Sequence, residues 1–173
     1  MKLVNKKTII NIIRSFPIIS LFIIVFTGFD LSFYFYKTSL SFNFAYLIIF
    51  FFVLKNPSSI GYGLIFFAGI INDVVQNFPI GISSVNYLLL CAIASFIRSR
   101  MVIPNLFYDW VLFFIAILIV SSINYSLLTM IFEIPIEYGT LMLSAIITFL
   151  IYPILSKIFN DKILSTLRND DDQ

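Results

Sequence analysis

The chain has 173 residues, of which 60% are hydrophobic and 12% are charged, and its mean hydropathy is +1.02. An ordinary soluble domain carries roughly 25% charged residues, so the composition excludes a soluble fold and indicates an integral membrane protein. Because ~20 apolar residues are needed to cross the hydrocarbon core, the chain holds at most about six spans in one domain. The net charge of +2 gives no reason to expect nucleic-acid binding.

Apolar segments follow one another along the chain and predict an all-α, polytopic membrane domain over 1–173. Polar turns interrupt the run, at Lys55–Ser59 and at Asn77–Gly81, where Pro79 and Gly81 favour a tight turn. Aromatic residues 33–36 are typical of an interfacial belt. About six transmembrane helices are expected, at about 16–29, 38–54, 60–78, 83–97, 107–132 and 138–159, followed by a charged tail over 160–173.

Basic residues divide unevenly between alternate connections. One set of connections, together with both tails, holds ten of the eleven Lys and Arg residues, and the other set holds only Lys37. Cytoplasmic connections carry the excess of basic residues, so we expect a multi-pass protein of the bacterial cytoplasmic (inner) membrane with both ends in the cytoplasm. The ten residues are Lys2, Lys6, Lys7, Arg14, Lys55, Arg98, Arg100, Lys157, Lys162 and Arg168.

The third segment carries polar residues at helical spacing. Gly69, Asn72, Asp73 and Gln76 follow an i, i+3, i+4, i+7 pattern, which places them on one face of a helix. A carboxylate at membrane depth is costly and by default marks a functional site. The alternative is that Asp73 lies near the outer interface and accepts hydrogen bonds from a neighbouring helix or caps the following turn. Both interpretations predict close packing of another helix against this segment. Its three glycines would let another backbone approach closely, and they are Gly61, Gly63 and Gly69.

The last segment shows a second pattern, in which hydroxyl-bearing residues recur every four positions and form one small ridge. Such a ridge favours a contact between helices. Pro153 lies within the same segment and is expected to remove one backbone hydrogen bond and to kink the helix. The ridge consists of Thr140, Ser144, Thr148, Tyr152 and Ser156.

Groups suited to catalysis are scarce. Histidine is absent, and the single cysteine, Cys91, lies in an apolar stretch where it is expected to pack as a small hydrophobic residue. No metal-ligand cluster, phosphate-binding loop or pair of nucleophile and base is visible. We therefore expect no enzyme, no cofactor and no metal.

The third and fourth segments contain Gly63, Gly69, Asp73 and Gly81 in the order G-x5-G-x3-D-x7-G, followed by a hydrophobic run over 87–97. This pattern, with the chain length, the basic N-terminal tail and the short charged C-terminal tail, resembles the MreD family of rod-shape-determining membrane proteins. The chain departs from that family at Asn72 and Gln76, where apolar residues are expected, which leaves open a further role for the polar face.

The resemblance implies a non-enzymatic scaffold of the cell-elongation machinery. Its partners would be the membrane-anchored protein MreC and, through it, the MreB filament and the peptidoglycan synthases. It also implies a six-helix fold shared with the substrate-binding S components of energy-coupling factor transporters. A subunit that binds a small solute, either a vitamin or a metal ion, is therefore the alternative function, and a homo-oligomer remains open.

A third hypothesis is an intramembrane enzyme acting on a lipid phosphate. Such an enzyme needs several charged residues that converge on the phosphate. The basic residues of this chain lie at the ends of the expected spans instead. We therefore rank this hypothesis last.

Overall fold

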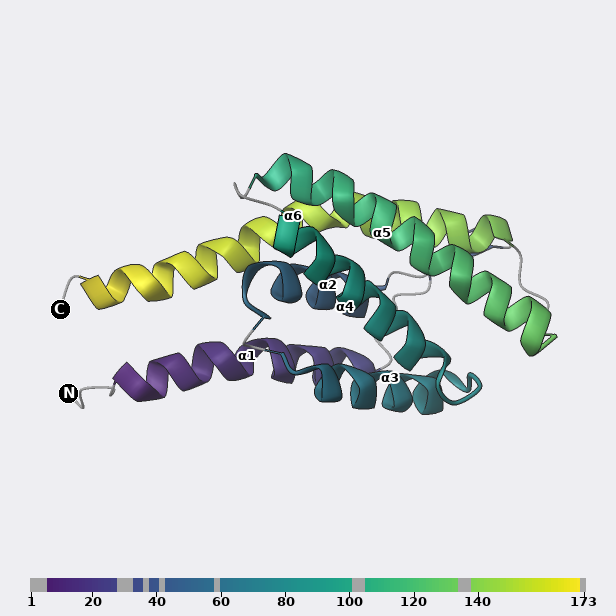
Figure 1. Ribbon diagram of the computed structural model, residues 1–173, viewed down its shortest axis with the longest axis horizontal. Coiled ribbons are helices and arrows are strands. Elements are labelled where there is room, and N and C mark those ends of the chain that lie inside the picture. Colours follow the sequence, from purple (N-terminus) through teal and green to yellow (C-terminus); the bar gives the residue numbers. More distant parts are fainter. Residues whose placement is uncertain are drawn as a thin grey trace.

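The computed structural model describes residues 6–27, 33–35, 38–40, 43–57, 60–100, 105–133 and 138–171. Within these ranges the chain forms six α-helices, one π-helical turn and one short hairpin (Figure 1). The elements in chain order are α1 (Lys6–Thr27), β1 (Phe33–Phe35), β2 (Thr38–Leu40), α2 (Phe44–Lys55), α3 (Tyr62–Gln76), α4 (Ile82–Arg100), α5 (Leu106–Ser126), η2 (Leu127–Ile131) and α6 (Tyr138–Asp171).

Three helical segments among the described residues are long and apolar enough to cross a membrane, namely Ile82–Arg100, Leu106–Ile131 and Tyr138–Asn160. The other apolar helices are shorter, and they cover Ser15–Thr27, Phe44–Lys55 and Tyr62–Gln76. The fold is therefore that of a helical membrane protein with three candidate spans, and a six-span topology stays a prediction.

The hairpin corrects the expected start of the second span. Strands β1 and β2 are antiparallel, with Phe33 paired to Leu40 and Phe35 paired to Thr38. Aromatic and β-branched residues favour strands, and only two residues separate these strands, as in a tight hairpin. Helix α2 consequently begins at Phe44 and not near Thr38, and the all-α fold contains one short hairpin before this helix.

Helix α2 forms the centre of the molecule, between α1, α4 and α6 (Figure 1). Every side chain from Ala45 to Leu54 is buried. A helix that is hydrophobic on all sides is stable only when other elements cover all of it. Phe50 shows this packing, since its ring centroid lies 5.0 Å from that of Phe113 on α5 and 5.9 Å from that of Tyr152 on α6.

The outer helices extend beyond the apolar segments expected from the sequence. Helix α1 begins at Lys6, and α6 continues without a break through Pro153 to Asp171, so the charged tail is helical as far as that residue. The first turns of α1 and the last turns of α6 lie at the same end of the molecule (Figure 1). Residues 28–29, the end of the expected first span, lie outside the described ranges.

Candidate functional site

The polar residues of the third segment lie where α3 turns back into α4. Asn77 adopts the left-handed conformation with φ 56°, and its backbone N–H donates to the carbonyl oxygen of Asp73. The N–H of Phe78 donates to the same oxygen at 2.9 Å. Gly81 has φ +105°, a conformation that a residue without a side chain adopts at little cost. The motif glycine at 81 is thus required by the turn.

The carboxylate of Asp73 is fully buried and binds the backbone at the start of α4. One oxygen accepts the backbone N–H of Gly81 at 2.7 Å, and the other accepts that of Ser83 at 2.9 Å. The N-terminus of a helix has unpaired N–H groups and a partial positive charge, so it stabilises a negative charge. Asp73 therefore acts as a cap for α4 that is supplied by the preceding helix.

The neighbouring polar residues face the same helix. The side-chain amide of Asn72 donates to the hydroxyl of Ser83 at 2.9 Å. Gln76 is half-buried and also has a partner. The polar face predicted from the spacing therefore lies in the contact between α3 and α4, and the partners that the structure gives to Asp73 and Asn72 are protein atoms.

Only one of the three glycines of this segment permits a close approach. A β-carbon added to Gly69 would lie 2.5 Å from the backbone nitrogen of Ser84, so the two backbones are in direct contact. The hydroxyl of Ser84 donates to the carbonyl of Phe66 at 3.0 Å and holds this crossing. Gly61 and Gly63 are exposed and have nothing within 4 Å of such a carbon, so no other helix of the described chain approaches them, and a contact of these two glycines with a partner stays a prediction.

The hydroxyl ridge of α6 is directed into the protein. Ser144, Thr148, Tyr152 and Ser156 are buried, and Thr140 is half-buried. Thr148 donates its hydroxyl proton to the Ser144 carbonyl at 2.7 Å and accepts the backbone N–H of Asn43 at 3.3 Å. Small residues with locally satisfied hydroxyls allow helices to pack closely in an apolar medium.

A buried ion pair joins α2 to α5. The ammonium nitrogen of Lys55 lies 2.5 Å from Oδ2 of Asp109, whose side chain is 2% exposed. Lys55 is in the last turn of α2 and Asp109 is in the first turn of α5. The positive charge therefore lies at the negative end of one helix dipole and the negative charge at the positive end of the other, and both positions are favourable. The second oxygen, Oδ1, is buried and has no hydrogen-bond partner in the described part of the chain.

Sequence reasoning missed this pair because Asp109 stands at the beginning of a long apolar segment and resembles the usual polar residue at a membrane boundary. The sequence feature that could have indicated the pair is the carboxylate of Asp109 within the first turn of that segment. A second contact that the pattern did not reveal joins α4 to α5, where the Asn86 side-chain amide donates to Oδ1 of Asn124 at 2.8 Å. Both contacts use residues far apart in the sequence.

The polar side chains of Asp73, Ser84, Asn86 and Asp109 thus serve contacts between helices. Among the described residues there is no group of three or more His, Cys, Asp and Glu side chains that could hold a metal ion, and Cys91 is buried. The class of protein is therefore a helical membrane protein whose buried polar groups link neighbouring helices. Comparison of the chain with protein families, with curated proteins and with solved structures finds no match in any of the three.

Proposed function

We propose that the chain is a membrane scaffold of the bacterial cell-elongation machinery, related to the MreD family, which contacts MreC and thereby helps to direct peptidoglycan synthesis and to maintain rod shape. The observation that carries the proposal is the motif of Gly63, Gly69, Asp73 and Gly81. Three of these residues have a defined part in the α3–α4 hairpin: Gly69 at the helix crossing, Asp73 as the cap and Gly81 in the turn.

The proposed setting is the cytoplasmic membrane, with six spans and both ends in the cytoplasm. Its support is the distribution of basic residues, since ten of the eleven fall on one side of this topology. The start of α1 and the end of α6 at the same end of the molecule agree with it (Figure 1). The likeness to the six-helix fold of the S components remains part of this proposal.

Depletion of the protein in its native bacterium tests the proposed function. We expect rod-shaped cells to become round and new wall synthesis to lose its normal pattern, because a scaffold positions the enzymes that carry out the synthesis. A plasmid copy of the intact chain should restore both. Unchanged morphology and unchanged wall insertion after complete depletion would contradict the proposal.

The contact with MreC is tested by co-purification. Gly69→Leu should reduce the yield of MreC, since it separates α3 from α4, whereas Gly61→Leu changes a glycine of the same segment that has open space around it. Equal recovery of MreC with both variants and with the intact chain would count against the hairpin as the partner-binding element.

The alternative is a membrane subunit that binds a small solute, a vitamin or a metal ion. It was suggested by the polar face of Asn72, Asp73 and Gln76, and fold analogy is otherwise a weak argument for function. Because Asp73 and Asn72 already bind α4, they are occupied by protein contacts. We therefore rank the scaffold first, and a vitamin or metal ion found with the purified protein by native mass spectrometry would reverse the order.

A further inference from the structure

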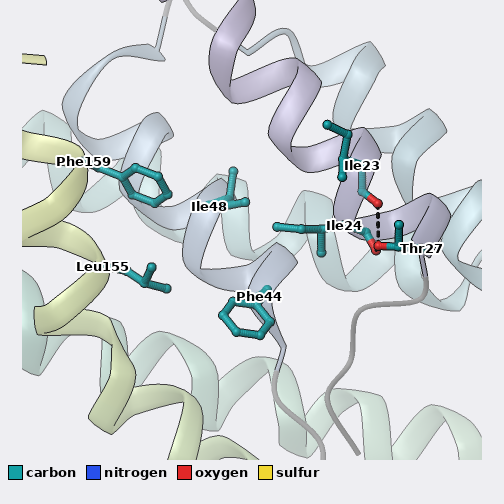
Figure 2. Close-up of a pocket in the computed structure, with 7 residues that line it drawn as sticks. All are labelled: Ile23, Ile24, Thr27, Phe44, Ile48, Leu155 and Phe159. Carbon is teal, nitrogen blue, oxygen red and sulfur yellow. Dashed lines mark hydrogen bonds between the residues drawn. The ribbon is translucent and has the colours of Figure 1, made fainter. Parts of the chain in front are cut away.

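A groove runs between α1 and α6, with α2 as its floor (Figure 2). Its volume is about 360 Å³. The lining residues converge from the three helices, and Figure 2 shows the α6 side chains facing those of α1 across the α2 side chains. They are Ile23, Ile24 and Thr27 from α1, Phe44 and Ile48 from α2, and Leu155 and Phe159 from α6.

The lining offers an occupant no hydrogen bond. All of the surface that faces the groove is apolar. The one hydroxyl, on Thr27, donates to backbone carbonyls of its own helix, at 2.7 Å to Ile23 and 3.2 Å to Ile24. Figure 2 shows this bond as a dashed line. A polar or charged ligand would lose its hydration here without compensation, so the occupant must be apolar.

The groove is too small to enclose a whole helix, so a molecule that lies within it must be narrower. A helix with its side chains is about 10–12 Å wide. A space of about 360 Å³ holds only about a dozen groups of the size of a water molecule, and a methylene group is of similar size. At one end the Phe159 ring meets the Phe16 ring of α1, with centroids 6.4 Å apart, which brings the two walls together. The space therefore fits one slender, flexible hydrocarbon chain.

We propose that this groove binds one acyl chain of a membrane phospholipid, held between α1 and α6. The groove borders the candidate span Tyr138–Asn160, so it lies beside the hydrocarbon region in which acyl chains are the abundant slender apolar molecules. The bound chain packs between α1 and α6 and against Phe44, which is half-buried at the start of α2. This binding site goes beyond the proposed scaffold function and does not depend on it.

The test compares two substitutions on neighbouring turns of α1. Ile23 lines the groove and is 57% exposed, while Ile19 lies one turn earlier, is 55% exposed and is absent from the lining. The intact chain, Ile23→Trp and Ile19→Trp are reconstituted in vesicles of palmitoyl-oleoyl phosphatidylglycerol, extracted in mild detergent and analysed by native mass spectrometry. We expect the intact chain and Ile19→Trp to retain one phospholipid per chain.

For Ile23→Trp we expect the fraction of chains with bound phospholipid to fall about tenfold, since the indole displaces roughly two methylene groups of the acyl chain. Equal retention by all three proteins would overturn the proposal. A lipid-free dimer that Ile23→Trp converts to a monomer would also overturn it, in favour of a second copy as the occupant. If Ile23→Trp does not yield a helical protein, Leu155→Trp on the opposite wall takes its place, with the exposed neighbour Ile154→Trp as its control.

Discussion

Asp73 combines an acidic side chain, complete burial and two hydrogen bonds from the backbone at the start of α4. An unpaired carboxylate in this position would be costly, and the N-terminus of α4 removes most of that cost because it offers free N–H groups and a favourable dipole. The acidic side chain of Asp73 thus has a structural use that explains its presence in an apolar segment.

Replacement of Asp73 should weaken the hairpin in proportion to the acceptors lost. Asp73→Leu leaves the N–H groups of Gly81 and Ser83 unpaired, and we expect it to lower the free energy of unfolding by about 3 kcal/mol. Asp73→Asn keeps one acceptor and should cost about 1 kcal/mol. Equilibrium unfolding in mixed detergent micelles measures both values. If both variants were as stable as the intact chain, the cap would contribute little to stability.

Two glycines of one helix should respond to alanine in opposite directions. Gly69→Ala places a methyl group against the Ser84 backbone and is expected to cost about 1–3 kcal/mol. Gly63→Ala has open space and should be neutral or stabilise α3 by up to about 1 kcal/mol, because alanine favours a helix. Thermal unfolding of both variants in the same detergent gives the comparison. A loss of stability in both would contradict the assigned crossing point.

At the scale of elements, α6 remains a single helix through Pro153 because α5 supplies a substitute donor. Proline has no N–H, so the carbonyl four residues earlier, that of Phe149, loses its partner. The indole N–H of Trp110 donates to this carbonyl at 2.9 Å, and its ring stacks on the Phe149 ring with centroids 4.7 Å apart. The only tryptophan of the chain is therefore placed at the one carbonyl that Pro153 leaves free.

A double-mutant cycle tests this substitution of donors. Trp110→Phe should cost about 1–3 kcal/mol in the intact chain, since it leaves the Phe149 carbonyl unpaired in an apolar region. In a Pro153→Ala background the helix provides its own N–H, so the same change should cost about 1 kcal/mol less. The free energies of unfolding of the four proteins measure the coupling. Additive effects would mean that Trp110 contributes only through its ring.

Replacement of the two partners of the ion pair between α2 and α5 should lower the free energy of unfolding by different amounts. Lys55→Met leaves the carboxylate of Asp109 buried without its cation and should cost about 3–5 kcal/mol. Asp109→Leu leaves Lys55, whose side chain is 25% exposed and can turn toward water, so we expect a loss of about 1–2 kcal/mol. Unfolding measurements on both variants and on the double variant provide the test. A larger loss for Asp109→Leu would refute the asymmetry.

At the scale of the whole molecule, the short central helix α2 depends on its neighbours. Its 12 residues extend about 18 Å, less than the hydrocarbon thickness of about 30 Å. A polar contact lies at each end of α2. The backbone N–H of Asn43 is bound to Thr148 at one end, and Lys55 is paired with Asp109 at the other. The longer helices α5 and α6 therefore hold the two ends of α2 in place.

Thiol labelling tests the proposed topology of the whole chain. The buried Cys91 is first replaced by alanine, and a new cysteine is introduced either at Lys37 or at Arg100. A membrane-impermeant reagent should label Lys37→Cys in intact cells and Arg100→Cys only after lysis, because the proposed topology places the basic connections in the cytoplasm. Labelling of both positions from the same side would contradict six spans with both ends inside.

Hydropathy was sufficient to predict a helical membrane protein, because an apolar medium forces each backbone to satisfy its hydrogen bonds within a helix. Spacing was sufficient to place Asp73 and Gly69 on one face and Gly81 in a turn. Spacing placed Gly69, but not Gly61 or Gly63, on the polar face, yet it did not show which of the three glycines lies where another helix crosses. Only the position of Ser84 on α4 makes one of them necessary.

The same limit applies to the partners of the buried polar groups. Periodicity shows which side of a helix is polar, whereas the partner depends on which side of another helix lies opposite. Lys55 with Asp109, Trp110 with the Phe149 carbonyl, and the groove above α2 all arise from the packing of helices that are distant in the sequence. These features were decided by the tertiary structure, because burial removes water and leaves each polar group only the neighbours that packing provides.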